Sequence, residues 1–226
     1  MLQLIDKGKI YFYVIILFIL LSIHNKNSIY YFSNFFKIQR IILNSDLDEN
    51  YNKEIINSLN KYYNFNIYTI NQDDLIETFD KYNLINEFSV KKVYPSSIQI
   101  HLKKTNLLAS FIENNQKIYL GENGKKIKKK LDNNDLPKIF GKFKIEEFFN
   151  LRNQLIKNGF NISNFNKFYC FKSNRWDLVY KDQLLIRLPI SEIDLSISKL
   201  KTFIEDPNLK NIKTIDMRIK NKIIIS

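Results

Sequence analysis

Few side chains in this sequence could take part in catalysis. Histidine, which moves protons near neutral pH and binds metals, occurs only twice, as His24 and His101. His24 lies in a short polar break, and His101 lies on the side of a predicted strand that faces water. Neither belongs to a nucleophile or metal motif, so both are interpreted as ordinary polar residues. An enzyme is therefore a minor hypothesis.

The remaining candidates for chemistry have structural explanations. Cys170 is the only cysteine, so no internal disulfide can form, and its apolar surroundings FYCF predict a buried, unreactive thiol. Glu146 and Glu147 are expected on the polar face of a helix, and Asp216 is expected in an ion pair within a strand. The sequence lacks a glycine-rich phosphate loop and a metal-spaced cluster, so we expect neither cofactor nor metal.

One apolar run stands apart from the rest of the sequence. Residues 10–23 read IYFYVIILFILLSI, and these 14 residues would cover roughly 21 Å as a helix, short of the ~30 Å core of a bilayer. An aromatic stretch at residues 29–36 can extend the span. We predict an uncleaved transmembrane anchor at residues 10–31 behind a cytoplasmic tail of residues 1–9. A cleaved signal peptide and a buried core helix are the alternatives.

The composition is basic along the whole chain. A formal net charge of +12 and a pI near 9.5 would suit a nucleic-acid partner. Lys, Asn and Ile are abundant from end to end, however, which indicates a compositional bias rather than a binding patch. The run KKIKKK at residues 125–130 is interpreted as a solvated loop, with contact to anionic lipid as an alternative. No nucleic-acid partner is expected.

The residues after the anchor are predicted to form two domains, at residues 36–105 and 106–226. In the first, residue spacing predicts strand, helix, helix, strand and strand at residues 36–43, 51–63, 72–84, 87–94 and 98–103. Apolar and polar residues alternate along residues 98–103, so one face of the sheet should be buried. This order predicts a three-stranded sheet covered by two helices.

The second domain is predicted to be rich in strands. They are expected at residues 108–112, 117–120, 167–172, 176–180, 184–188, 214–219 and 222–225. Helices are expected at residues 145–157 and from Ser191, as the N-cap, to about residue 205. The last strand is expected at a sheet edge, where unpaired backbone groups can accept another strand.

Four segments form an ordered set along the chain. They read VKKVYPSSIQI at residues 90–100, LPKIFG at 136–141, NRWDL at 174–178 and IDMR at 215–218. In order and spacing they resemble the strand pair that closes the POTRA domain, a loop, an RWxL strand and the near-terminal strand of the FtsQ/DivIB family. With the apolar run in front of them, the resemblance covers the chain from residue 10 to its end.

This resemblance implies an α+β fold, with a single N-terminal transmembrane helix, a POTRA domain, and an antiparallel β-sheet domain with flanking helices. It implies a non-enzymatic scaffold of the cell inner membrane, with its body in the periplasm at the division septum. The family binds FtsB and FtsL, works with FtsW, FtsI and FtsK, and helps control septal peptidoglycan synthesis. A POTRA-containing envelope assembly or transport factor is the alternative.

The partner-binding site is predicted at the last strand and the residues before it. The edge that would accept a segment of FtsB consists of Ile219, Lys222, Ile223, Ile224 and Ile225. Arg218 matches an arginine of the family motif and could bind a partner carboxylate through two nitrogens, although an internal pair with Asp216 is the alternative. Arg175 is a further candidate, and Trp176 beside it is expected in the core.

Overall fold

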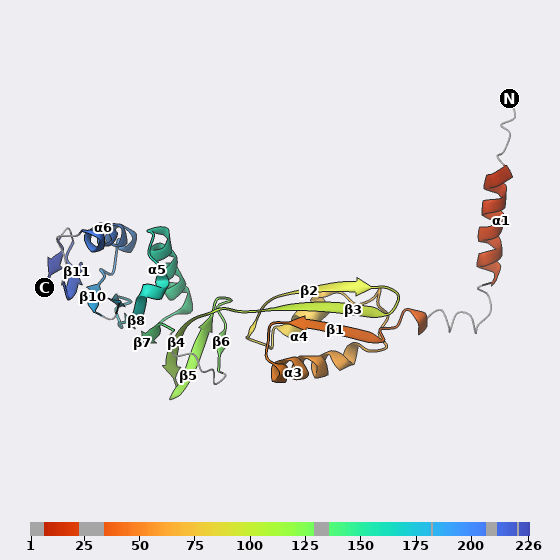
Figure 1. Cartoon of the computed structure of the whole chain (residues 1–226), viewed down its shortest axis with the longest axis horizontal. Helices are drawn as coiled ribbons and strands as arrows, with labels where there is room; N and C mark the ends of the chain where they lie inside the picture. Colours follow the sequence, from red (N-terminus) through yellow and green to blue (C-terminus); the bar gives the residue numbers. More distant parts are fainter. Residues whose placement is uncertain (1–6, 23–33, 129–135, 182, 207–211, 221) are drawn as a thin grey trace, which may run out of the picture. The chain divides into compact units, whose positions relative to one another are not determined.

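The computed structural model describes residues 7–22, 34–128, 136–181, 183–206, 212–220 and 222–226 (Figure 1). Backbone contacts divide the chain between Lys104 and Thr105. The part up to Lys104 is called the N-terminal unit below, and the part from Thr105 is called the C-terminal unit.

A three-stranded sheet forms the centre of the N-terminal unit. The elements of this unit are α1 (Lys7–Ser22), β1 (Arg40–Ser45), α3 (Glu49–Leu59), the 3-10 turn η1 (Asn60–Tyr62), α4 (Gln72–Phe79), β2 (Ile85–Val93) and β3 (Ser97–Lys104). The strand order is β1-β3-β2, with β1 parallel and β2 antiparallel to β3. Buried and solvent-facing side chains alternate along β3, and the apolar faces of α3 and α4 complete the core. The predicted sheet and its two helices are confirmed.

The helix predicted at residues 72–84 is shorter than expected. It begins correctly after Asn71, whose backbone N–H donates to Asp74 Oδ2 at 3.0 Å, but α4 ends at Phe79. Two successive turns then lead into β2, with Tyr82 N donating to the carbonyl of Phe79 at 2.9 Å and Ile85 N to that of Tyr82 at 3.0 Å. Helical spacing of apolar residues therefore continued past the last helical hydrogen bond.

The predicted anchor is only partly described. Helix α1 has 16 residues, or roughly 24 Å at the rise of an α-helix. None of them is buried. Residues 23–31 of the expected span lie outside the described residues. Within the described part of the chain, no helix is both long and apolar enough to cross a membrane.

The C-terminal unit is built on a sheet with nine described strands. Its elements are β4 (Leu107–Glu113), β5 (Gln116–Gly121), β6 (Lys126–Ile127), β7 (Lys138–Phe140), α5 (Ile145–Lys157), η2 (Ile162–Asn164), β8 (Phe165–Cys170), β9 (Trp176–Tyr180), β10 (Leu184–Arg187), α6 (Ile193–Glu205), β11 (Thr214–Asp216) and β12 (Ile224–Ile225). The strand order is β12-β11-β10-β9-β8-β7-β4-β5-β6, so β12 and β6 are the edges.

The expectation of an antiparallel sheet is wrong for three neighbouring pairs. Strands β4 and β7, β7 and β8, and β10 and β11 run parallel. Parallel neighbours need a long crossover, usually a helix. Helix α5 connects β7 to β8, and α6 connects β10 to β11, so each helix is a crossover rather than a separate flanking element.

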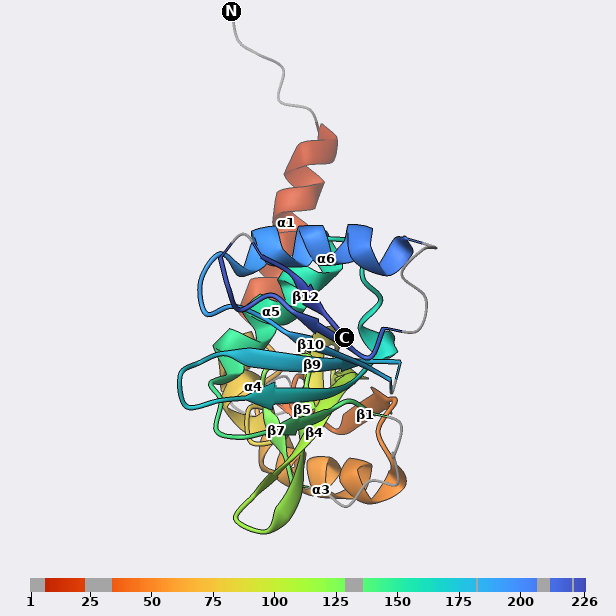
Figure 2. The same ribbon diagram turned by 90° about the vertical axis from the view of Figure 1, so that its left-hand side faces the viewer.

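Both crossover helices cover the same face of the sheet (Figure 2). Phe148, Leu151 and Leu155 of α5 and Ile197 and Leu200 of α6 pack into one core with the inward residues of the strands. Trp176 is 2% exposed in this core, as expected. The N-cap of α6 is Glu192, in a left-handed conformation with φ 58°, so the expected cap at Ser191 is wrong by one residue.

Candidate functional site

The edge strand β12 has one row of backbone groups that points away from the sheet. Thr214 and Ser226 exchange two backbone hydrogen bonds, of 2.9 and 3.1 Å, and Ile215 is the partner of Ile225 in the register. Hydrogen-bonded and non-hydrogen-bonded pairs alternate in an antiparallel ladder. Ile225 therefore belongs to a non-bonded pair, and its N–H and C=O are directed to the outer side of the edge. An extended segment could form main-chain hydrogen bonds there.

Charged side chains of alternating sign continue across the sheet to this edge. The register places Asp177 of β9 beside Arg187 of β10, Arg187 beside Asp216 of β11, and Asp216 beside Ile224 of β12. These side chains lie on the face opposite α5 and α6, because their neighbours in the strands belong to the core. Opposite charges in directly paired positions stabilise a sheet, so this row helps hold the last strands in register.

Asp216 is bound by two arginines. It accepts hydrogen bonds from Arg218 Nε at 2.8 and 2.9 Å, from Arg218 Nη2 at 2.6 Å and from Arg187 Nη1 at 3.4 Å. The hydrogen bonds from Arg218 are the main reason that the pKa of Asp216 falls to about 2, although burial opposes this shift. The internal pair, which was the alternative for Arg218, is thus present, while its guanidinium remains partly exposed to solvent.

Asp177 differs from Asp216 because burial dominates its environment. Its residue is 6% exposed, and Arg175 donates to it through Nε at 3.2 Å and Nη2 at 3.5 Å. Desolvation raises the pKa of Asp177 above its ordinary value, although Arg175 and Arg187 act in the opposite direction. The guanidinium of Arg175 also lies 4.1 Å from the ring centroid of Phe171, so two contacts fix its position.

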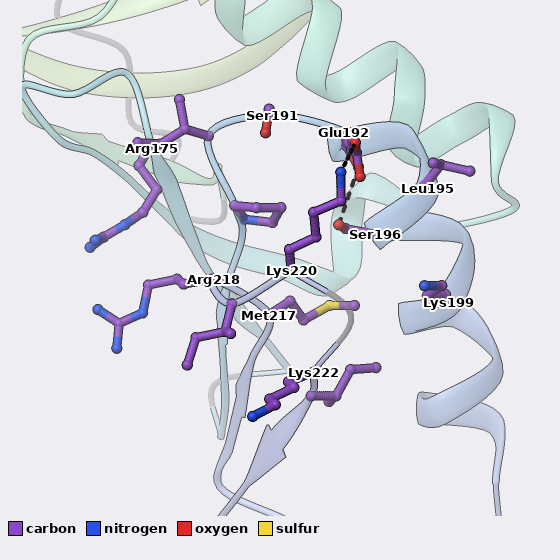
Figure 3. A pocket seen from close by; sticks show the side chains of 14 residues that line it. Arg175, Ser191, Glu192, Leu195, Ser196, Lys199, Met217, Arg218, Lys220 and Lys222 are labelled. Carbon is purple, nitrogen blue, oxygen red and sulfur yellow. Dashed lines mark hydrogen bonds and ion pairs between the residues drawn. The ribbon is translucent and has the colours of Figure 1, made fainter.

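A hollow of about 470 Å³ lies next to the edge strand (Figure 3). It is formed by the loop before α6, the first half of α6 and the segment between β11 and β12. Ile190, Leu195 and Ile219 in its lining are each more than half exposed. Lys199 and Lys222 add positive charge, whereas Lys220 is paired with Glu192 at 2.9 Å. Its surface therefore suits a segment that carries both apolar and acidic side chains.

All seven residues predicted for partner binding meet at this place. Ile224 and Ile225 form β12, and the other five line the hollow: Arg175, Arg218, Ile219, Lys222 and Ile223. Ile190, Leu195 and Arg187 also belong to this place but were not predicted from the sequence. Leu195 carried a signal, since it is an apolar residue on the otherwise polar face of its helix. No feature of the sequence indicated Arg187, because its role depends on which strands are paired.

Of the groups considered for catalysis, Asp216 belongs to this site through its pairs with Arg218 and Arg187, whereas His101 and Cys170 lie outside it. His101 is exposed on β3, and Cys170 is buried in the core of the C-terminal unit. Burial, followed by the charge of Glu147, raises the pKa of the Cys170 thiol, which disfavours the nucleophilic thiolate. Among the described residues, no group of three His, Cys, Asp or Glu side chains could hold a metal ion. His24 and Lys129–Lys130 lie outside the described residues.

Replacing Asp216 by Asn should remove a pH dependence of stability. The folded-state pKa of about 2 lies below the ordinary value of 3.8, so the carboxylate stabilises the fold above pH 4. That stabilisation is lost as the pH falls from about 4 to about 2. In urea unfolding at pH 6, we expect the wild type to have a larger free energy of unfolding than Asp216→Asn. This difference should become smaller as the pH falls toward 2. Emission of the single Trp176 is the readout. A difference in the free energy of unfolding that stays constant over this range would contradict the lowered pKa of Asp216.

Two protein-family models match the chain. The model described as "POTRA domain, FtsQ-type" matches residues 36–104, and the one described as "Cell division protein FtsQ/DivIB, C-terminal" matches residues 111–218. The matched ranges together cover most of the chain and both units. They stop at Arg218, so the segment from Ile219 to Ile225 lies beyond them. A search of curated proteins finds no match.

Proposed function

The chain belongs to the FtsQ/DivIB family of cell division proteins, and from this premise we propose that it is a scaffold of the bacterial divisome rather than an enzyme. Such a scaffold acts by holding partners together. The features that support this role are an open sheet edge and an adjoining hollow with an apolar and basic lining. Septal peptidoglycan synthesis by FtsW and FtsI is the process that it helps control, and FtsK is a further division partner.

The proposed contact is the addition of a strand of FtsB to β12, with FtsL joining in the same complex. The outward direction of the Ile225 N–H and C=O is the observation that carries this proposal. An added strand would gain affinity from main-chain hydrogen bonds and selectivity from side chains at alternate positions. Ile224 and Ile225 are 51% and 43% exposed, so a partner segment could cover apolar surface on both faces of the edge.

The hollow is proposed to bind the part of FtsB that flanks its added strand. Apolar partner residues would cover Ile190, Leu195 and Ile219, while a carboxylate would lie near Lys199 and Lys222. Arg218 could share its guanidinium between Asp216 and a partner carboxylate, since 42% of its side chain is exposed. Arg175 is held more firmly, with 21% of its side chain exposed, and is the weaker candidate.

We also propose that the chain is anchored in the inner membrane through residues 10–31, with its two units in the periplasm. The uncharged apolar stretch within α1 supports this, together with the absence of any buried residue in that helix. An anchor confines the units to a thin layer beside the membrane and raises their effective concentration for partners in the same bilayer.

The test of the division role is the position of the protein in growing cells of its source. A fluorescent protein fused to the N-terminus of the full chain should form a ring at midcell before constriction. A signal spread evenly over the envelope would argue against a divisome scaffold and for a general envelope factor. A fusion truncated after residue 33 serves as a matched control, since it keeps the anchor and lacks both units.

A further inference from the structure

A cluster of exposed aromatic side chains lies at one end of the N-terminal unit. It is called the aromatic patch and consists of Phe35, Phe36, Phe65, Tyr68 and Tyr94. Four of the five are more than half exposed: Phe35 at 57%, Phe65 at 54%, Tyr68 at 56% and Tyr94 at 54%. Exposed apolar surface gathered at one place usually marks an interaction site, whereas single exposed residues need no explanation.

Three separate segments build the aromatic patch. They are the chain before β1, the loop between η1 and α4, and the turn between β2 and β3, which meet at one end of the sheet (Figure 1). Ile67 N donates to the carbonyl of Phe36 at 2.9 Å, and Ile38 N donates to that of Phe65 at 2.9 Å. Gln39 N donates to the carbonyl of Ser96 at 2.8 Å. The backbone therefore holds the patch in place.

Four of the five rings contact one another in a continuous run, and the ring of Phe65 packs against that of the buried Tyr62, with centroids 6.2 Å apart. Ring centroids are 5.3 Å apart for Phe35 and Phe36, 5.2 Å for Phe36 and Tyr68, and 5.1 Å for Tyr68 and Tyr94. Neighbouring rings restrict each other, so little conformational entropy remains to be lost on binding. The outer surfaces of these rings form one preformed apolar area.

The three segments that carry the aromatic patch have charges of one sign only, and the carboxylates nearest to a patch residue along the chain are Asp73 and Asp74 at the start of α4. These segments contain no Asp or Glu, and they comprise residues 34–40, 61–69 and 91–97. Their basic residues are Lys37, Arg40, Lys61, Lys91 and Lys92. A surface that combines Tyr and Phe rings with Lys side chains matches the headgroup region of a bilayer, where aromatic rings accumulate and Lys attracts anionic lipid.

The covalent chain keeps the aromatic patch near α1. Residues 23–33 separate the end of α1 from Asn34, so even a fully extended connection would span at most roughly 40 Å. Phe35 and Phe36 are themselves among the first described residues after this connection. A membrane that holds α1 would therefore lie within reach of the patch.

We propose that the aromatic patch binds the surface of an anionic lipid bilayer and thereby fixes the orientation of the N-terminal unit on the membrane. The inference rests on the proposed anchor. The rings of Phe65, Tyr68 and Tyr94 enter the headgroup region, and Lys37 and Lys92 lie beside lipid phosphates. A tether of this length gives an effective concentration in the millimolar range, so a patch of weak intrinsic affinity is still occupied.

A tryptophan at position 94 tests the inference in the full chain. Tyr94→Trp keeps an aromatic ring in the patch, and the chain is reconstituted into vesicles of anionic phospholipid whose acyl chains are brominated near the headgroup. Glu87→Trp is the matched control, because Glu87 lies on β2, the strand that ends just before Tyr94, and is seven residues and roughly 23 Å away from it. This change removes two exposed contacts, an ion pair with Lys103 at 3.6 Å and a hydrogen bond from Asn86 Nδ2 at 3.2 Å. Trp176 contributes the same background to both variants.

We expect the added tryptophan of Tyr94→Trp to lose about half of its emission through contact with brominated lipid. The added tryptophan of Glu87→Trp should lose almost none. The same vesicles are washed at alkaline pH to test the anchor separately. Equal quenching of both variants in vesicles that retain the protein would overturn the inference and leave the anchor intact. Release of the protein by the wash would overturn the anchor and the inference with it.

Discussion

Proline at position 225 is expected to weaken binding of the FtsB segment by about a hundredfold while the C-terminal unit stays folded. Proline has no N–H and would place its ring where the incoming strand must approach. A loss of about 3 kcal/mol, the usual effect of proline within a hydrogen-bonded element, corresponds to this factor. The β11–β12 ladder should survive, because the Ile225 N–H points away from β11.

Two further variants make this experiment specific. Ile225→Val keeps the N–H and most of the apolar side chain, so it should bind within a few-fold of wild type. Ile224→Pro removes an N–H that faces Asp216 in the ladder, so it should detach β12 from β11. Affinity is measured by titrating a labelled FtsB peptide into the full chain in detergent micelles. Unchanged binding by Ile225→Pro would show that the partner does not add a strand at this edge.

The sequence allowed the N-terminal unit to be predicted better than the C-terminal unit, because its signals are local. Alternating burial along residues 98–103 and the cap at Asn71 follow from near neighbours in the chain. In the C-terminal unit, α5 and α6 were recognised, but their role as crossovers between parallel strands was not. Which strands pair depends on contacts between residues far apart in sequence, which periodicity does not report.

The difference between contacts that are near in sequence and contacts that are far apart also explains which parts of the candidate site could be predicted. Asp216 and Arg218 are two residues apart, so their internal pair could be foreseen from the period of a strand. The contribution of Arg187 could not, because it arises from the parallel register of β10 and β11. The hollow likewise requires Ile190 and Leu195 to come together with the segment after β11. The sequence therefore located the edge, while the fold was needed to supply its surroundings.

Alanine at position 141 should destabilise the C-terminal unit by about 3 kcal/mol, a large part of the stability of an ordinary domain. Gly141 follows β7 with φ +92°, which side chains rarely tolerate. A Cβ there would also overlap the backbone carbonyl oxygen of Cys170. That oxygen belongs to the backbone of β8, which is paired with β7 on one side and β9 on the other, so it cannot move aside cheaply.

Gly124→Ala separates the two causes of this destabilisation. Gly124 also has a positive φ, of +75°, but an added Cβ would meet nothing within 4 Å. Its replacement should therefore cost only the conformational strain, about 1 kcal/mol. Urea unfolding of both full-length variants in detergent micelles, followed by the emission of Trp176, measures the difference within the same unit. Similar losses in the free energy of unfolding for both variants would mean that β7 and β8 can separate with little loss of stability. That result would contradict their place in the middle of the sheet.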